Sequence, residues 1–369
     1  MKAVRCAAGA KLSVGYGPLM GERQEIFSGT EPVRERHRVD PARLEAWMRE
    51  HVSGFRGRLE LLQFKGGQSN PTYRIEAGGT RYVVRRKPPG QLLPSAHAVD
   101  REYRVLTALQ GTGVPVPRTY ALCTDEAVLG TWFYVMECVE GRVFWEPALP
   151  DLEPRERFAI YDSLSEVLAK LHSVDWRAVG LADYGRPGNY FGRQLSRWWK
   201  QYQASVEHPH AAMERLADWL PRTIPPGDET TLIHGDFKLD NTIVHPTEPR
   251  IAAVIDWEIS TLGHPLGDLS YLCMPWFRLG AFRGLDLDQL GLPRLDAYAA
   301  SYFRRAGRPS LDSFAWYEAF QLFRSACILQ GIIGRVRDGT ASSDHATTLA
   351  DAIGPQANAA WKIAQSLGA

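Results

Sequence analysis

HGDFKLDN, at residues 234–241, is the stretch that decides the fold, and IDWE follows it at residues 255–258 after a short apolar run. These stretches place Asp236, Asn241 and Asp256 in polar segments beside predicted strands. Magnesium prefers hard oxygen ligands and needs only one or two protein side chains when phosphates supply the rest, so Asn241 and Asp256 are candidate metal ligands. Asp236 can orient the proton of an attacking hydroxyl. A polar hairpin turn would explain the glycine but not this ordered set of oxygen atoms.

The spacing within this stretch is typical of phosphoryl transfer. Asp236 precedes Asn241 by five positions, as in the H-R-D-x-x-x-x-N catalytic loop of protein kinases, with glycine in place of arginine. Asp256 opens no D-F-G sequence, but its place after an apolar strand suits the same metal-binding task. Lys238 is expected to neutralise charge on the transferred phosphoryl group, and Asp240 to cap the turn. The pattern therefore predicts Mg²⁺-dependent transfer from ATP to an alcohol.

The rest of the chain predicts an α+β fold in two parts. A helix is expected to begin after Asp40-Pro41, a cap followed by a proline at the first helical turn. Strands are expected at residues 59–64, 72–76, 81–86 and 131–139, with glycine turns between the first three and one main helix at 96–109. Beyond Gly141, helices are expected at 157–172, 190–202, 211–220, 311–336 and 346–367, with a hairpin near 243–255. We therefore predict a mobile extension at residues 1–38, a nucleotide-binding N-lobe at 39–140, and a catalytic and substrate-binding helical C-lobe at 141–369.

Several further stretches carry a family resemblance. Together with the loop at 234–241, they are GGQSNPTY at residues 66–73, RRKPPG at 85–90, DREY at 100–103 and ME at 136–137. The sequence resembles the aminoglycoside phosphotransferase and choline kinase superfamily over residues 40–350. Within it, the sequence is most similar to the kinase-like module fused to some acyl-CoA dehydrogenases and to its free-standing bacterial relatives. The resemblance implies a two-lobed, protein-kinase-like fold with an antiparallel sheet in the N-lobe and ATP in the cleft, and it implies no flavin chemistry.

The resemblance also assigns roles to residues of the N-lobe. A glycine turn would cover the phosphates of the nucleotide, because backbone N–H groups without a nearby Cβ can approach them closely; it comprises Gly67, Gln68, Ser69 and Asn70. Arg85, oriented by Glu102, would bind the α- and β-phosphates, with Lys87 as the alternative because it shares the same strand face. The adenine edge would lie at the end of the last strand, near Met136, Glu137 and Val139. His234 and Asp268 are expected to brace the catalytic loop.

Composition and missing motifs exclude other classes. The chain of 369 residues has 43 basic and 42 acidic residues, so no charge excess points to nucleic acid or to an anionic membrane. The sequence contains no P-loop, no G-x-S-x-G elbow, no H-E-x-x-H zinc motif, no secretory signal and no apolar run long enough for a membrane span. The five cysteines form no C-x-x-C pair, which favours a reducing cytoplasm.

The predicted partner is a small molecule that carries a hydroxyl group. A hydroxyacyl-CoA or hydroxy acid is favoured, because residues 276–288 are aromatic and mixed in charge, with Arg278 and Arg283. An aminoglycoside or amino alcohol is the alternative acceptor, and a polycation would call for a strongly acidic pocket. A nucleotide-binding pseudokinase without turnover is the alternative from another class. The sequence gives no signal for ATP over GTP or for an oligomeric state.

Overall fold

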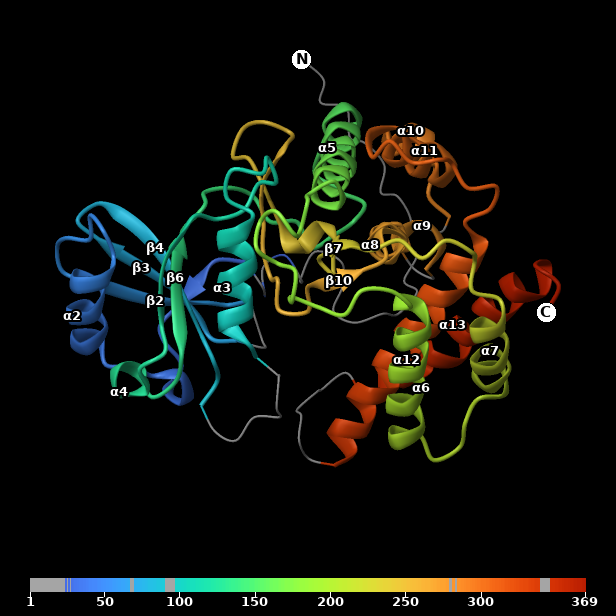
Figure 1. Cartoon of the computed structure of the whole chain (residues 1–369), viewed down its shortest axis with the longest axis horizontal. Helices are drawn as coiled ribbons and strands as arrows, with labels where there is room; N and C mark the ends of the chain where they lie inside the picture. Colours follow the sequence, from blue (N-terminus) through green and yellow to red (C-terminus); the bar gives the residue numbers. More distant parts are fainter. Residues whose placement is uncertain are drawn as a thin grey trace, which may run out of the picture.

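The computed structural model describes residues 24, 26, 28–66, 70–89, 97–278, 281–282, 284–338 and 346–369, with only the backbone at 346–349. Figure 1 shows a strand-rich lobe beside a larger, mostly helical lobe. This is the α+β, two-lobed arrangement that the sequence predicts. No helix in the described part of the chain is long and apolar enough to cross a membrane.

The N-lobe is built on one antiparallel sheet with the strand order β1-β2-β3-β4-β6-β5. The strands are β1 (Thr30–Glu31), β2 (Glu60–Phe64), β3 (Thr72–Ala77), β4 (Thr80–Arg86), β5 (Thr119–Cys123) and β6 (Phe133–Glu137). The turn between β3 and β4 contains Gly78 and Gly79, both with positive φ, a conformation that glycine adopts without a steric penalty. Strand β4 lies between β3 and β6, so its side chains are buried from Tyr82 to Arg86.

Side chains that alternate along β4 face two different layers. Tyr82 and Val84 belong to a core cluster shared with helix α2 (Pro41–His51), whereas Val83 belongs to a cluster shared with helix α3 (Val99–Ala108). Because side chains along a strand point to opposite faces in turn, Arg85 lies on the same face as Val83. The pattern therefore places Arg85 toward α3, which carries Glu102.

The C-lobe is formed mainly by long helices. Its helices are α5 (Pro154–His172), α6 (Tyr190–Ser205), α7 (Ala211–Arg222), α8 (Pro265–Leu272), α9 (Met274–Phe277), α10 (Leu287–Leu290), α11 (Leu295–Arg305), α12 (Ala315–Arg337) and α13 (Ala346–Ser366). Two short antiparallel ribbons complete it: β7 (Thr231–Ile233) with β10 (Thr261–Gly263), and β8 (Thr242–Val244) with β9 (Ile251–Val254). Three further short helices complete the described part of the chain: η1 (Glu35–His37) and α4 (Glu126–Leu129) lie among the N-lobe strands, and η2 (Leu239–Asn241) precedes β8.

The connection between the lobes is tightly packed. Arg142 exchanges two backbone hydrogen bonds with Val244 of β8, at 2.7 and 2.8 Å. A Cβ atom at Gly141 would lie 2.3 Å from the Val244 carbonyl oxygen, so only glycine fits this close approach. One hydrophobic cluster includes Val83 of β4 and Tyr134 of β6 together with buried residues of the C-lobe helices. The lobes therefore share a continuous core near the site.

Several elements were absent from the sequence prediction. These are β1, β5, β10 and α4; the region of α8 to α11 was expected to be helical, but without bounds for the individual helices. The predicted strand at 131–139 is shorter than expected, because β6 runs only from Phe133 to Glu137. In addition, α2 covers one face of the N-lobe sheet while α3 covers the other, so the lobe has two main helices rather than one.

Candidate active site

The loop between β7 and β8 is held rigidly from its first residues. Asp268 on α8 accepts hydrogen bonds from the backbone N–H groups of His234 and Gly235, at 2.6 and 2.8 Å. The His234 ring Nε2 lies 2.9 Å from the Ile255 carbonyl oxygen. Gly235 has a φ of 85°, and a Cβ there would lie 2.9 Å from the Ile259 carbonyl oxygen. Glycine is therefore required at this turn, and Asp268 and His234 fix the loop to its neighbours.

Asp236 lies at the centre of this loop with two polar side chains around it. The Asn241 amide nitrogen donates to the Asp236 carbonyl oxygen at 2.9 Å and to its carboxylate Oδ2 at 2.7 Å. The Lys238 Nζ lies 3.4 Å from Asp236 Oδ2 and 3.2 Å from Asp240 Oδ2. Burial favours the neutral acid, but the Lys238 ammonium and the Tyr271 hydroxyl outweigh it, so the pKa of Asp236 lies below its ordinary value. Asp236 is therefore ionised at neutral pH.

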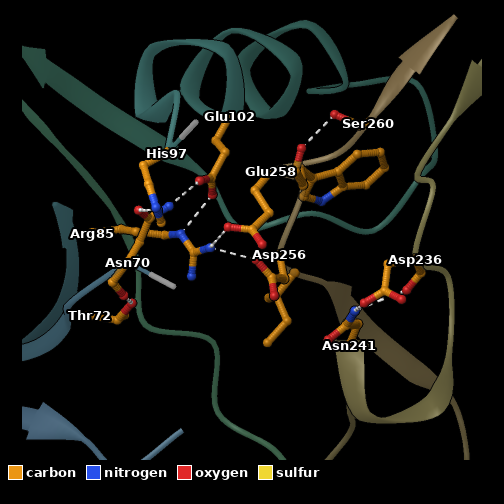
Figure 2. A network of polar contacts seen from close by, with 12 residues as sticks. Asn70, Thr72, Arg85, His97, Glu102, Asp236, Asn241, Asp256, Glu258 and Ser260 are labelled. Atoms are coloured by element: carbon orange, nitrogen blue, oxygen red, sulfur yellow. Dashed lines mark hydrogen bonds and ion pairs between the residues drawn. The ribbon is translucent and has the colours of Figure 1, made fainter. Parts of the chain in front are cut away.

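The two candidate metal ligands are joined through the backbone. The Ile255 N–H donates to the Asn241 carbonyl oxygen at 3.0 Å, which places Asp256 beside Asn241. Asp256 has a φ of 66°, and non-glycine residues in this region are uncommon and concentrate at functional sites. Figure 2 shows Asp256, Asn241 and Asp236 on neighbouring strand ends and loops.

The donor set at this place fits Mg²⁺. Asn241 uses its amide nitrogen on Asp236, which directs its amide oxygen elsewhere, and Asp256 adds a partly exposed carboxylate. Among the described residues, no group of three or more His, Cys, Asp or Glu side chains could hold a metal ion. Such a small set of hard oxygen ligands is typical of Mg²⁺ sites where phosphates and water complete the coordination.

Arg85 connects the N-lobe to this loop system. Its Nε lies 2.7 Å from Glu102 Oε2, and its Nη2 lies 2.5 Å from Asp256 Oδ1 and 3.6 Å from Glu258 Oε2. Arg85 and Glu102 are buried, whereas the two other carboxylates are partly exposed. Burial opposes the charge of Arg85, but its carboxylate partners raise its pKa well above the ordinary value. A single guanidinium therefore links α3 with the segment after β9 (Figure 2).

The orientation of Glu102 is fixed by neutral donors. The Asn70 amide nitrogen donates to Glu102 Oε1 at 2.9 Å, and the Tyr134 hydroxyl donates to Oε2 at 3.1 Å. The His97 ring lies 2.9 Å from the Asn70 amide oxygen. Asn70 is fully buried, so its side chain supports Glu102. The other residues predicted to cover the phosphates, Gly67, Gln68 and Ser69, lie outside the described residues.

Lys87 lies in a different environment from Arg85. Strand β4 ends at Arg86, and the Lys87 Nζ lies 3.7 Å from Asp100 Oδ1 and 4.3 Å from the centre of the Trp132 ring. The structure brings Arg85, and not Lys87, to Glu102 and Asp256. This geometry favours Arg85 as the phosphate-binding cation of the two.

The predicted adenine-binding residues lie at the end of β6. Met136 is buried and pairs with Val83 of β4. Glu137 is exposed, and its carboxylate accepts a hydrogen bond from the Arg118 N–H at 3.2 Å. Val139 follows the end of the strand and is half-buried. Their contact with a nucleotide base stays a prediction.

Sequence reasoning missed three residues of this region. Glu258 lies two residues after Asp256 in the stretch IDWE, and this closeness in sequence to a predicted site residue is the signal that could have found it. Tyr271 on α8 and Arg324 on α12 contact the catalytic loop region from distant parts of the sequence. No local pattern connects these two residues with residues 234–241.

A cavity of about 170 Å³ opens beside the catalytic loop. The loop supplies Lys238, Leu239 and Asp240 to its wall, and α8 supplies Tyr271. The remaining lining is mostly aromatic and apolar, with one further cation: Phe144, Trp145, Pro147, Tyr161, Leu272, Met274, Pro275, Arg278 and Ala281. Small-molecule sites commonly combine such an apolar lining with a few polar groups.

Curated relatives match the chain over most of its length. Mouse acyl-CoA dehydrogenase family member 10 is 43% identical over 346 residues, covering 92% of this chain and 32% of the relative. Rat acyl-CoA dehydrogenase family member 11 is 41% identical over 352 residues, covering 92% of this chain and 45% of the relative. The chain thus spans less than half the length of these two relatives.

A solved structure is similar at the level of sequence and fold. A candidate aminoglycoside phosphotransferase from Ralstonia eutropha JMP134 superimposes with a TM-score of 0.82 and 50% identity, covering 89% of this chain and 99% of that one. The family model described as "Phosphotransferase enzyme family" matches residues 60–317, which is more than half of the chain. These matches confirm the family resemblance and the kinase-like fold. The chain belongs to the phosphotransferase enzyme family.

Proposed function

We propose that the chain is an ATP-dependent small-molecule kinase that transfers the γ-phosphate to a hydroxyl group. The observation that carries this proposal is the convergence of two charge clusters at the lobe junction. Arg85 with Glu102 and Asp256 forms one, and Asp236 with Asn241 and Lys238 forms the other. Solved relatives of the same fold contain ADP or AMP-PNP, which supports a nucleotide donor.

Each residue has one task in the proposed reaction. Asp236 accepts a hydrogen bond from the acceptor hydroxyl and directs its oxygen toward the γ-phosphorus. Arg85, oriented by Glu102, binds the α- and β-phosphates. Asn241 and Asp256 would hold Mg²⁺, which when bound neutralises charge on the phosphates. Positioning and charge neutralisation supply most of the barrier reduction in such transfers.

We propose a hydroxyacyl-CoA or hydroxy acid as the acceptor. The cavity beside the loop supports this choice, because its walls are aromatic and apolar and its two cations, Lys238 and Arg278, outnumber its one carboxylate, Asp240. An aminoglycoside is a polycation, and such a lining would repel it rather than attract it. The similarity to acyl-CoA dehydrogenase family members also favours an acyl compound. Because the chain is 50% identical to a candidate aminoglycoside phosphotransferase from Ralstonia, aminoglycosides are also tested as acceptors.

The test is a transfer assay with Mg²⁺ and ATP. Purified chain is incubated with hydroxyacyl-CoAs, hydroxy acids, amino alcohols and aminoglycosides, and phosphorylated product is detected by mass spectrometry. Asp236→Asn should lower kcat by about 10²- to 10⁴-fold, the range for a lost general base. Asp218→Asn is the matched control, because Asp218 is an exposed residue of α7 paired only with Arg222.

Three outcomes would count against parts of the proposal. Tight ATP binding with no product from any acceptor would favour a pseudokinase. Product from aminoglycosides alone would overturn the proposed acceptor class. Turnover that survives Asp236→Asn would remove Asp236 from its role.

We also propose that the protein works in a reducing compartment such as the cytoplasm, because all four cysteines among the described residues are free.

A further inference from the structure

Arg324 reaches the catalytic loop from α12, near the far end of the sequence. Its Nη2 donates to the Gly235 carbonyl oxygen at 3.0 Å, directly before Asp236. The N–H of the same glycine donates to Asp268 Oδ1 at 2.8 Å. Gly235 is therefore held at its N–H by a carboxylate and at its carbonyl by a guanidinium. Both contacts are charge-assisted hydrogen bonds, the stronger kind.

Arg324 is a buried cation without a carboxylate partner among the described residues. The residue is 5% exposed, and its Nε has no hydrogen-bond partner in the described part of the chain. Its other contacts are the Gln321 amide oxygen at 3.4 Å and the ring centres of Tyr271 and Trp198, at 4.8 and 5.6 Å from the guanidinium carbon. Burial of a cation is costly unless hydrogen bonds offset it, which favours the contact between Arg324 and the Gly235 carbonyl oxygen.

Asp236 follows the peptide that Arg324 holds, and the next peptide is held as well. Arg324 contacts the Gly235 carbonyl oxygen at 3.0 Å, and the Asn241 amide nitrogen donates to the Asp236 carbonyl oxygen at 2.9 Å. Hydrogen bonds on two consecutive carbonyl groups therefore fix the backbone from which the Asp236 side chain projects.

Helix α8 is braced by the same part of α12. The Gln321 amide nitrogen donates to the Gly267 carbonyl oxygen at 2.9 Å and to the Ser270 hydroxyl at 2.8 Å. Helix α8 in turn carries Asp268 and, three residues later on the same face, Tyr271. One turn of α12, Gln321 to Arg324, thus fixes both the helix that anchors the loop and the loop itself.

We propose that Arg324 is a positioning residue for Asp236, an inference that rests on the proposed kinase function. Its guanidinium fixes the peptide between Gly235 and Asp236 through the Gly235 carbonyl oxygen. The Asp236 carboxylate is thereby aimed at the acceptor hydroxyl. Arg324 itself does not contact the acceptor or the nucleotide.

The test compares Arg324→Met and Arg324→Lys with the wild-type chain. Arg324→Met should lower kcat about ten- to hundredfold, the equivalent of one lost charge-assisted hydrogen bond, and leave the KM for ATP nearly unchanged. Arg324→Lys, which keeps a positive charge and a hydrogen-bond donor, should restore much of kcat. Arg337→Met is the matched control, since Arg337 is a more exposed arginine of α12.

A merely structural role gives a different result. If Arg324→Met lowers the melting temperature but leaves kcat per folded molecule unchanged, the inference is wrong. A second measurement needs no acceptor: hydrogen exchange of the backbone amides of residues 234–241 in the full chain. Exchange there should be faster in Arg324→Met than in the wild-type chain and in Arg337→Met; unchanged exchange overturns the inference. Absence of turnover in the wild-type chain would sink the proposed function, while this exchange measurement would still decide the role of Arg324.

Discussion

Arg85→Met should destabilise the protein in a way that depends on pH. The substitution removes the cation 2.7 Å from Glu102, a carboxylate whose side chain is 1% exposed. Asp256 and Glu258 also lose a partner, but their side chains are 30% and 25% exposed, so water can solvate them. The cost therefore falls mainly on Glu102. Burial already raises its pKa, despite Arg85 beside it, and loss of Arg85 raises it further.

Protonation limits this cost. Glu102 can take up a proton instead of remaining charged, and from its ordinary pKa of 4.5 this costs at most about 3.4 kcal/mol at pH 7, at 1.36 kcal/mol per pH unit. A group whose pKa is raised on folding stabilises the fold below its unfolded pKa and loses that contribution as the pH rises. The deficit of Arg85→Met relative to wild type should thus be largest near pH 8 and should shrink toward pH 5.

Urea unfolding at pH 5 and pH 8 measures this difference as a shift in midpoint. Arg222→Met is the control, because Arg222 forms an exposed pair with Asp218 and such pairs contribute little. A deficit that is equal at both pH values, or larger at pH 5, would refute the assignment of the cost to a buried, unpaired Glu102. A deficit well above the limit at pH 7 would show that lost packing of the arginine dominates.

Four further results are expected. Gly141→Ala should cost about 1–3 kcal/mol in thermal unfolding, because a Cβ would lie 2.3 Å from the Val244 carbonyl oxygen; an unchanged melting temperature would contradict the close approach. Lys87→Met should leave the affinity for Mg-ATP within about twofold in calorimetry, since its partner Asp100 is exposed; a large loss would restore Lys87 as the phosphate ligand. Asp268→Asn should lower kcat about tenfold or more by weakening charge-assisted hydrogen bonds to the loop, measured per folded molecule. ATP should bind more weakly in EDTA than with Mg²⁺, and equal affinities in calorimetry would argue against a metal-dependent site.

Local sequence patterns were sufficient for much of the fold. The glycine turns and β-rich runs predicted β2, β3 and β4, and the Asp40-Pro41 pair predicted the start of α2, where Asp40 accepts hydrogen bonds from two backbone N–H groups. Strand β5 was missed, because it follows a proline-rich stretch at 114–117 that interrupts the strand pattern. Strands β1 and β10 have only two and three residues, and their pairing partners are distant in sequence. Such strands depend on tertiary contacts rather than on local preference.

The residues of the candidate site were likewise predicted only in part from the sequence. Asp236 and Asn241 lie within one short loop, so their spacing alone predicted that they meet. The choice between Arg85 and Lys87 could not be made from alternation, because both share a strand face. It depends on β4 ending at Arg86, which leaves Lys87 beside Asp100. Arg324 is separated from the loop by several helices, and only the packing of α12 against α8 brings it there.

The ion pairs around Arg85 explain why the proposed nucleotide site needs a metal ion. They join one cation to three carboxylates, those of Glu102, Asp256 and Glu258. Asp256 and Glu258 are partly exposed, so a bare polyanionic nucleotide would be repelled by them. A divalent cation cancels this excess while Arg85 keeps its partner Glu102. The proposed dependence on Mg²⁺ thus follows from the charges around Arg85 and not only from the oxygen atoms of Asn241 and Asp256.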